Sequence, residues 1–381
     1  MCGLTLLNRI ADKKIPVEQL LREWPPGYGG VERVAHELAS VWGGAVYSLD
    51  VQGHSGKGDD PLSVAYPRKR LRSIHIFSRL TLPLPSRSLV HLLLSSKPLH
   101  GHLPSPGVLF VLLLAQLLRP RRRITAHWHC FLDRGLGFRG LLYTIYQWLA
   151  LCVVPNLTMV VTTSPQLAQE LKCCGCASEK LLVLPCCLSQ QQESACLALP
   201  VPEARSGQLI RVLFIGRLDS YKRLDWLLLA LASLTSPWQL SVVGDGPKRH
   251  RFEQLAQRLF PHASPVRFFG RLSEDAKMDQ LEMSDLLVLP SDCSNEAFGI
   301  VQLEAMAAGR PALAFDHPRS GMGWVGQLSV LPWRQSPEGL ADVLQRLADQ
   351  PQLLRLVSEK ARERYIKLFA RSVWLQLLEG F

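Results

Sequence analysis

Two glutamates stand eight positions apart in the segment SDCSNEAFGIVQLEAMAAG, where Glu296 precedes an expected helix and Glu304 lies within it. A carboxylate accepts several hydrogen bonds, which suits the adjacent hydroxyls of a ribose or another sugar. Gly299 has no side chain and would let the backbone approach a ligand where the helix begins. The segment therefore indicates a site for a nucleotide-sugar. The alternative is that Glu296 caps the helix and Glu304 is a surface acid, since acidic residues are favoured near helix starts in any case.

Two basic residues follow an apolar stretch in the segment GRLDSYKR. Arg217 and Lys222 bracket the start of the next expected helix, where backbone N–H groups have no partner within the helix. Both side chains could converge there on a diphosphate through charge-assisted hydrogen bonds. The alternative for each is a solvated surface position, which is the usual state of arginine and lysine.

Strands and helices alternate throughout the second half of the chain. Apolar runs predict the strands, and leucines at helical spacing predict the helices between them. Ser273 is expected to cap one of these helices, because acidic residues follow it where the helix dipole favours negative charge. The alternation predicts a parallel sheet covered by helices on both faces. The predicted strands are residues 209–215, 240–243, 266–269, 286–289 and 311–315.

The first half shows the same alternation less clearly. We expect a strand at residues 17–21, a glycine loop at 26–30 and then a helix. Later strands, around Ile124 and at residues 160–163, flank a predicted helix. Polar residues interrupt the long apolar run at 141–163, so we interpret it as a buried helix and a strand rather than a membrane span.

The alternation in both halves predicts two α/β domains. The polar, proline-containing segment between them is the best linker candidate. We therefore predict a first domain at residues 1–190, a linker at 191–207 and a second domain at 208–365. Open parallel sheets bind ligands beyond the carboxyl ends of their strands, so the facing edges of the two domains are expected to form a cleft.

With 381 residues, 47% of them hydrophobic, the chain is too long for one ordinary core and too apolar to be disordered. Its N-terminus lacks an uninterrupted secretory core, so we expect a cytoplasmic protein with reduced thiols. A cysteine cluster offers a zinc site as an alternative, but its spacing and apolar surroundings favour buried thiols, and we predict no metal. The cluster comprises Cys173, Cys174, Cys176, Cys186 and Cys187.

The formal net charge of +11 has a local origin, because residues 61–132 contain no Asp or Glu. Such a basic region favours an anionic partner, such as a lipid headgroup surface or a phosphorylated acceptor. Nucleic acid is disfavoured, since apolar residues surround the charge and no nucleic-acid-binding signature accompanies it. Ordinary solvated arginines are the alternative. The basic residues are Arg68, Lys69, Arg70, Arg72, Arg79, Arg87, Lys97, Arg119, Arg121, Arg122 and Arg123.

Several motifs together resemble those of the retaining glycosyltransferases of family 4, which have the two-domain GT-B fold. They are PPGYGGVERVAHELA near the N-terminus and, later, GRLDSYKRLDWLLLAL, VVGDGP, VRFFGRLS and DLLVLPSDCSNEAFGIVQLEAMAAGRPALA. Their order and spacing are similar to the family's across nearly the whole chain. The resemblance implies two Rossmann-like domains facing across a cleft, with a C-terminal helix at about 366–381 that crosses back to the first domain.

The resemblance also implies roles for individual residues. Arg217 and Lys222 match the basic pair that holds the donor diphosphate and stabilises its charge during departure. Glu304 matches the acid that binds the ribose, and Glu296 matches the acid beside the donor sugar. The backbone that meets sugar and phosphate corresponds to Phe298, Gly299 and Ile300, and the N-terminal glycine loop near the diphosphate corresponds to Gly29 and Gly30.

One histidine is singled out by the same resemblance. His129, in ITAHWHC, best matches the family's strand-end histidine beside the sugar, with His127 as the second candidate. A lone histidine is otherwise more often structural. The chain departs from the family at Pro185-Cys186-Cys187-Leu188, where a Pro-x-Gly turn usually enters the linker.

The implied reaction is transfer of a sugar from a nucleoside-diphosphate-sugar to a hydroxyl, with retention and with no metal or other cofactor, because no D-x-D motif occupies a matching position. The basic, apolar first domain favours a lipid-linked or surface saccharide as acceptor and peripheral contact with an anionic membrane. A nucleotide-sugar epimerase of the same fold and a non-catalytic nucleotide-sugar-binding protein are the alternatives.

Overall fold

The computed structural model of the chain describes residues 16–23, 29–49, 64–77, 80–133, 137–203, 209–262 and 265–381. Residues 1–15, positions 26–28 of the predicted glycine loop, and Arg79 lie outside the described residues. The chain divides into two compact units, which are Met1–Pro185 together with Phe381, and Cys186–Gly380.

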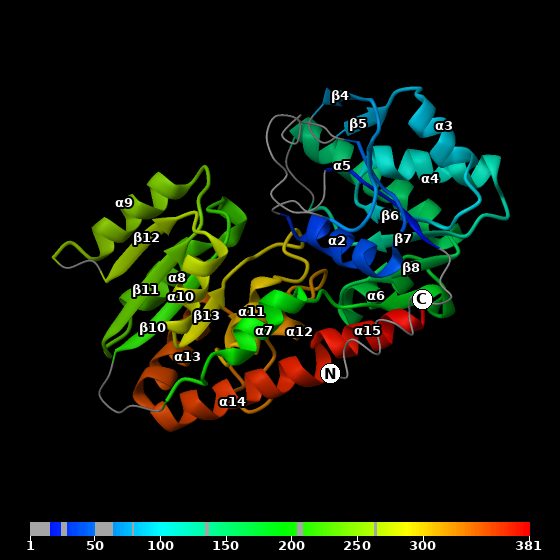
Figure 1. The fold of residues 1–381 in the computed structure, drawn as a ribbon. Coiled ribbons are helices and arrows are strands. Elements are labelled where there is room, and N and C mark those ends of the chain that lie inside the picture. The colour runs from blue at the N-terminus through cyan, green and yellow to red at the C-terminus, as the bar shows by residue number, and fades with distance from the viewer. Residues whose placement is uncertain are drawn as a thin grey trace. The chain divides into compact units, whose positions relative to one another are not determined.

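The first unit is built on seven strands, β1 (Glu18–Leu21), β2 (Val46–Ser48), β3 (Arg68–Arg70), β6 (Leu99–Leu103), β7 (Ile124–Trp128), β8 (Met159–Thr162) and β9 (Leu181–Val183). Their order in the sheet is β3-β2-β1-β6-β7-β8-β9, and every neighbouring pair is parallel (Figure 1). A separate antiparallel pair is formed by β4 (Ser73–Phe77) and β5 (Leu80–Pro83). Since β1 lies beside β6, the strand order reverses between these two strands, which is where sheets of this type bind ligands.

Helices connect and cover these strands. They are α2 (Gly30–Trp42), α3 (Arg87–Leu94), α4 (Pro106–Leu118), α5 (Gly137–Val153) and α6 (Pro165–Cys173). Beneath them, the interior of the sheet contains one buried ion pair, in which Arg122 Nη2 lies 2.9 Å from Glu18 Oε2. The sequence placed Arg122 in the basic region that we expected at the surface. The structure shows that Arg122 is an internal residue, so that prediction is wrong for this arginine.

We predicted from its apolar sequence that helix α5 is buried, and this prediction is wrong. Its inner side packs through Gln147, whose Oε1 accepts a hydrogen bond from the backbone of Leu132 at 2.5 Å. Its outer side is a continuous exposed apolar face that consists of Phe138, Leu141, Ile145, Trp148 and Leu149. Among the helices that the structure describes, none combines the length and the apolar composition that crossing a membrane requires.

The second unit is built on five strands, β10 (Ile210–Ile215), β11 (Trp238–Val243), β12 (Val266–Gly270), β13 (Leu286–Leu289) and β14 (Ala312–Ala314). Their order is β12-β11-β10-β13-β14, and all neighbours are parallel. The strands lie where the apolar runs predicted them. Two parallel Rossmann-like sheets are thus present, and the predicted fold class is confirmed.

The helices of the second unit are α7 (Gln190–Ala198), α8 (Leu224–Ala232), α9 (Arg249–Leu259), α10 (Glu274–Glu282), α11 (Val301–Ala307), α12 (Met322–Val325), α13 (Pro337–Asp349), α14 (Pro351–Leu368) and α15 (Arg371–Glu379). Ser273 caps α10 as predicted, since its side chain accepts a hydrogen bond from the backbone of Ala276 at 3.2 Å. Helix α15 groups with the second unit, and of the predicted terminal helix only Phe381 groups with the first.

The predicted linker at 191–207 contains most of helix α7. Ser189 and Gln192 form a capping box there, in which each side chain bonds the backbone N–H of the other. Two backbone N–H groups at the start of the helix gain hydrogen-bond acceptors in this way, which stabilises a helix in this polar segment. Residues 204–207 of the predicted linker lie outside the described residues.

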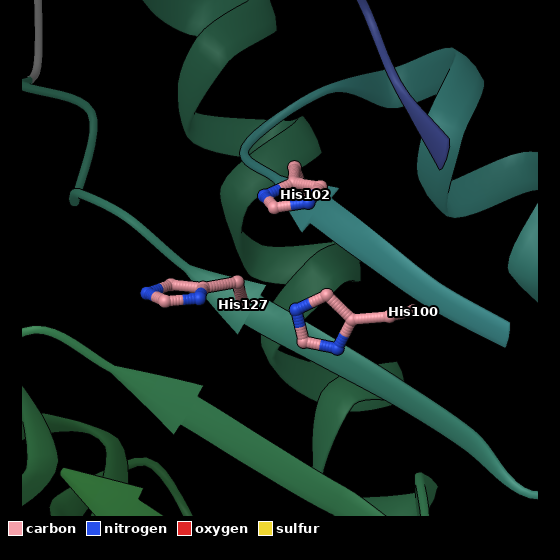
Figure 2. A group of neighbouring side chains, drawn as sticks. All are labelled: His100, His102 and His127. Atoms are coloured by element: carbon pink, nitrogen blue, oxygen red, sulfur yellow. The ribbon is translucent and has the colours of Figure 1, made fainter. Parts of the chain in front are cut away.

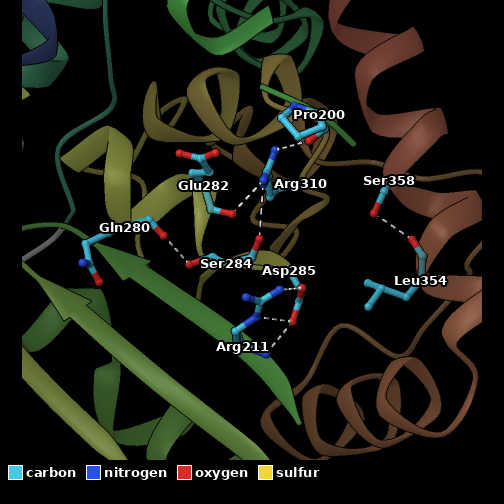
Figure 3. Close-up of polar contacts among 9 residues, drawn as sticks. All are labelled: Pro200, Arg211, Gln280, Glu282, Ser284, Asp285, Arg310, Leu354 and Ser358. Carbon is cyan, nitrogen blue, oxygen red and sulfur yellow. Dashed lines mark hydrogen bonds and ion pairs between the residues drawn. The ribbon is translucent and has the colours of Figure 1, made fainter. Parts of the chain in front are cut away.

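The amino ends of β10 and β13 are held together by a polar network (Figure 3). The buried guanidinium of Arg310 donates to the backbone oxygens of Pro200 and Glu282 at 2.8 Å, and burial lowers its pKa to about 10. Nearby, Asp285 accepts hydrogen bonds from Arg211, the nearest at 2.8 Å. A cavity of about 300 Å³ lies among these residues. Its position at the amino ends of the strands argues against its being a nucleotide site.

Candidate functional site

The strand order of the second unit fixes where a ligand is expected. β10 is followed in the chain by β11 on one side, while its neighbour on the other side is β13. Connections therefore leave these two strands in opposite directions, which opens a crevice at their carboxyl ends. The predicted basic segment GRLDSYKR follows β10, and the loop with Glu296 follows β13. Two segments predicted to bind a nucleotide-sugar thus end at the same edge of one sheet.

Lys222 and Glu296 join these two segments. The Lys222 ammonium donates to Glu296 Oε2, and their side chains are only 10% and 15% exposed. The Lys222 side chain folds over the end of β10, since its Nζ lies 3.6 Å from where a Cβ on Gly216 would stand. Burial opposes the charge of Lys222, but Glu296 and the neighbouring Tyr221 outweigh it, so the pKa of Lys222 is raised. The lysine is therefore held charged at the carboxyl end of the sheet.

A second link between the same loops was not predicted from the sequence. Arg223 Nη1 lies 3.0 Å from Asp292 Oδ2, and the backbone N–H of Asp292 donates to the carbonyl of Tyr221 at 3.2 Å. Arg223 has a left-handed backbone with φ of 48°, and its guanidinium lies 3.9 Å from the centre of the Trp226 ring. These contacts brace the loop that carries Lys222. Nothing in the sequence distinguished this arginine from its basic neighbours.

Arg217 is not joined to the Lys222–Glu296 pair. Its side chain is 67% exposed, and its Nε lies 3.7 Å from Asp219 Oδ2. An exposed ion pair of this length contributes little to stability. Arg217 therefore has a side chain that is available to an anion at the end of β10.

Glu304 is a buried acid, and the alternative of a surface acid is wrong. Only 1% of the residue is exposed, and Lys277 Nζ lies 3.0 Å from its Oε2. Lys277 also approaches Glu274 Oε2, at 2.7 Å. Sequence reasoning missed Lys277, although helix α10 brings it to the site. The lysine compensates the charge of Glu304, which without a partner would be costly to bury.

The backbone between Glu296 and Glu304 takes a conformation that requires glycine. Gly299 has a φ of 71°, and a Cβ at this position would lie 2.4 Å from Leu289 Cδ2. Phe298 is buried, and its carbonyl accepts a hydrogen bond from Gln302 Nε2 at 2.8 Å. Helix α11 begins just after Ile300. The predicted glycine is thus required by packing, whether or not a ligand approaches it.

In the first unit, the two described glycines of the N-terminal loop differ in their surroundings. Gly29 is the N-cap of α2, and a Cβ there would lie 2.1 Å from the Glu32 carboxylate. Gly30 begins the helix and has open space around it. Burial raises the pKa of Glu32. The carboxylate is the flexible end of a side chain that can turn aside, so neither position shows a local requirement for glycine.

His129 is not a lone histidine. It follows β7 directly, stacks on His127 with ring centres 4.2 Å apart, and its Nε2 lies 2.9 Å from His102 Nδ1. All three rings are buried. Burial, followed by the charges of the other histidines, holds the pKa of His129 well below its usual range. The ring is therefore neutral and fixed in place. Both predicted histidines belong to one cluster in the first unit.

Among the cysteines that the structure describes, no group has the spacing of a metal site. Cys176, Cys186 and Cys187 are buried as predicted, whereas Cys173 is exposed. Burial raises the pKa of Cys186 to about 12, so this thiol stays protonated. Within the described part of the chain, the group with the spacing of metal ligands contains histidines and no cysteine.

Comparison with known proteins agrees with this architecture. The sequence model of Glycosyltransferase Family 4 matches residues 28–191, and that of Glycosyl transferases group 1 matches residues 201–364. The D-rhamnosyltransferase WbpZ of Pseudomonas aeruginosa is 30% identical over 160 residues, which are 41% of this chain and 41% of WbpZ. The chain spans less than half the length of the curated relatives it matches.

Solved structures share the fold over nearly the whole chain. HepE of Anabaena, in complex with UDP, has a TM-score of 0.73 at 17% identity, and the match covers 97% of this chain and 99% of that one. The lipopolysaccharide outer core galactosyltransferase WaaB has a TM-score of 0.65 at 16% identity, with 96% and 98% covered.

Two Rossmann-like sheets in succession, each matched by a glycosyltransferase model, define the GT-B class. The chain belongs to glycosyltransferase family 4, and the family that its motifs resembled is confirmed.

Proposed function

We propose that this chain is a retaining glycosyltransferase that takes a sugar from a nucleoside-diphosphate-sugar bound at the carboxyl ends of β10 and β13. The observation that carries the proposal is the nearly buried Lys222–Glu296 pair at the point where the strand order reverses. A charged lysine fixed there before any ligand arrives is preorganised for a diphosphate. HepE, which shares the fold, is in complex with UDP, and this supports a nucleotide donor for this chain.

In the proposed reaction, negative charge grows on the diphosphate as the bond to the anomeric carbon breaks. Lys222 lies beside Gly216 at the end of β10 and can stabilise that charge without moving far. Arg217, which is exposed and loosely paired, would turn to the same oxygens. Fixed donors aimed at developing charge are commonly the largest single contribution to catalysis. Two cations in this role can stabilise the departing diphosphate without a metal ion.

The two glutamates then have different tasks. Glu304, buried and paired with Lys277, is proposed to accept hydrogen bonds from the ribose hydroxyls of the donor. Glu296 is proposed to lie beside the donor sugar, where binding of the diphosphate draws Lys222 partly away from it. Gly299 and Ile300 would bring backbone groups to the sugar and phosphate. In the first unit, Gly29, Gly30 and the neutral His129 are proposed to take part in the reaction.

We propose that the acceptor is a lipid-linked or surface saccharide that the first unit meets at an anionic membrane. Trp148 and its apolar neighbours on α5 are exposed, and α4 contacts both α5 and α3. Exposed Leu117, Leu118, Arg119 and Arg121 follow one another at the end of α4. An apolar face bordered by cations suits the headgroup region of an anionic membrane.

A donor screen followed by product analysis tests the proposed activity. The nucleotide-sugar that binds the native protein should raise its melting temperature. Incubated with that donor and a membrane lipid extract, a transferase yields a glycosylated lipid with the donor's anomeric configuration. An epimerase would instead convert the donor alone, and a binding protein would leave it intact. Either of these results would refute the proposed transfer.

A further inference from the structure

Strand β6 of the first unit carries His100 and His102, and β7 carries His127, which His129 follows just beyond the strand end. The parallel register pairs His102 with His127, and His100 with Thr125. One nitrogen from each of His100, His102 and His127 lies within 4.8 Å of one nitrogen from each of the other two (Figure 2). The three residues are at most 2% exposed. Neighbouring strands thus gather three imidazoles in a buried space.

The hydrogen bonds of two of these rings fix which nitrogen carries a lone pair. His100 Nδ1 lies 2.8 Å from Thr125 Oγ1, and that hydroxyl donates to the carbonyl of Leu99 at 3.5 Å. This arrangement favours donation from His100 Nδ1, which leaves the lone pair on Nε2. In the same way, His102 Nε2 donates to Gln19 Oε1 at 2.9 Å, which leaves the lone pair on Nδ1. Metal-bound histidines in proteins are oriented by the same kind of hydrogen bond from their second nitrogen.

Some ring nitrogens in this space have no partner among the described residues. They are His100 Nε2 and both nitrogens of His127. Buried polar atoms are nearly always hydrogen-bonded, so a set of orphans at one point needs an explanation. A ring nitrogen with a free lone pair is the atom of histidine that ligates a metal ion.

We propose that His100, His102 and His127 bind one zinc ion. Three histidines with an open fourth position are a known zinc ligand set. Zinc–nitrogen bonds of about 2.0–2.1 Å require the three nitrogens to draw together to about 3.3 Å, a movement that side-chain torsions can supply. When zinc takes the lone pair of His102 Nδ1, His129 Nε2 loses that acceptor, and water fills the fourth position. The site does not depend on the function proposed above.

Zinc binding is measured on the full chain without a histidine tag, after treatment with a chelator. Titration with zinc chloride should give one tightly bound ion per chain. His127→Gln and His100→Gln should each lower the affinity at least tenfold, and Thr125→Val, which keeps the shape but removes the hydroxyl, about tenfold. His250→Gln and His262→Gln, which replace exposed histidines, should bind zinc as the wild type does.

Cobalt(II) supplies a second measurement that needs no variant to fold. We expect the wild-type complex to show the intense visible bands of a tetrahedral site without a cobalt–thiolate charge-transfer band. Zinc should also raise the melting temperature of the wild type. The proposal is overturned if the chain takes up no zinc, if a thiolate band appears, or if the folded His127→Gln variant binds zinc unchanged.

Discussion

Lys222 and Glu296 form an ion pair across 74 positions of the chain because the strands before them, β10 and β13, are neighbours in the sheet. The two residues lie in different segments of the chain, so the pair forms only when the chain folds. Parallel strands bring their carboxyl ends to one edge, and the site is assembled from the loops that leave that edge.

The pair Lys277–Glu304 provides a first prediction. Lys277→Met leaves Glu304 buried without its cation, and breaking a buried pair by removing one partner costs about 3–5 kcal/mol. Urea unfolding should show that loss, and the affinity for the nucleotide donor should fall with it. Lys360→Met, at an exposed position, is the control and should leave both unchanged. Equal stability of the two variants would contradict the pairing.

Gly299 and Gly30 form a matched pair of glycines for a second prediction. Gly299→Ala places a methyl group against Leu289 at a φ of 71°, so we expect a loss of more than about 1 kcal/mol. Gly30→Ala meets open space at a helix start and should be neutral or stabilise by up to about 1 kcal/mol. Thermal melts of both variants compare them directly. The same destabilisation in each would mean that the backbone of Gly299 is not strained.

The sequence predicted the elements better than the contacts between them. The strands and helices of the second unit followed from apolar runs and leucine spacing, because local periodicity reflects burial. Lys277, Arg223 and Asp292 were missed, since charged residues carry no periodic signal and their partners are set by tertiary packing. The same limit explains α5, whose apolar residues serve both a buried and an exposed face.

The predictions for residues 1–15 and for positions 26–28 of the glycine loop remain predictions, because these residues lie outside the described residues. The histidine cluster shows how tertiary packing changes an interpretation. His129 was considered alone because its neighbours in space, on β6, are far away in the chain. Strand order, which the sequence did not reveal, determines which histidines meet.

Arg122 and Arg121 supply a third prediction from adjacent positions. Arg122 bonds Glu18 and the carbonyl of Lys97 inside the first unit, whereas Arg121 is exposed. Arg122→Met should therefore destabilise the protein by about 3–5 kcal/mol. Arg121→Met should have little effect on stability, as is usual for surface substitutions. Unfolding by urea distinguishes them, and a stable Arg122→Met variant would place Arg122 at the surface after all.

Membrane contact through α5 is the fourth prediction. Trp148→Ser with Leu149→Ser removes apolar surface from the exposed face and should reduce binding to vesicles of anionic lipid several-fold, as measured by co-sedimentation. Leu229→Ser, at an exposed leucine of the second unit, is the control and should bind like the wild type. High salt should weaken wild-type binding, because cations contribute to it. Binding that ignores both the substitutions and the lipid charge would exclude this face.

The turnover of Lys222→Ala tests the proposed site most directly. With the donor found in the screen, the variant should consume it at least about a hundredfold more slowly than the wild type, comparable to the loss of one oxyanion donor. Lys367→Ala, at an exposed lysine, should turn over like the wild type. Near-normal turnover by Lys222→Ala would contradict the assignment of this lysine to the departing diphosphate.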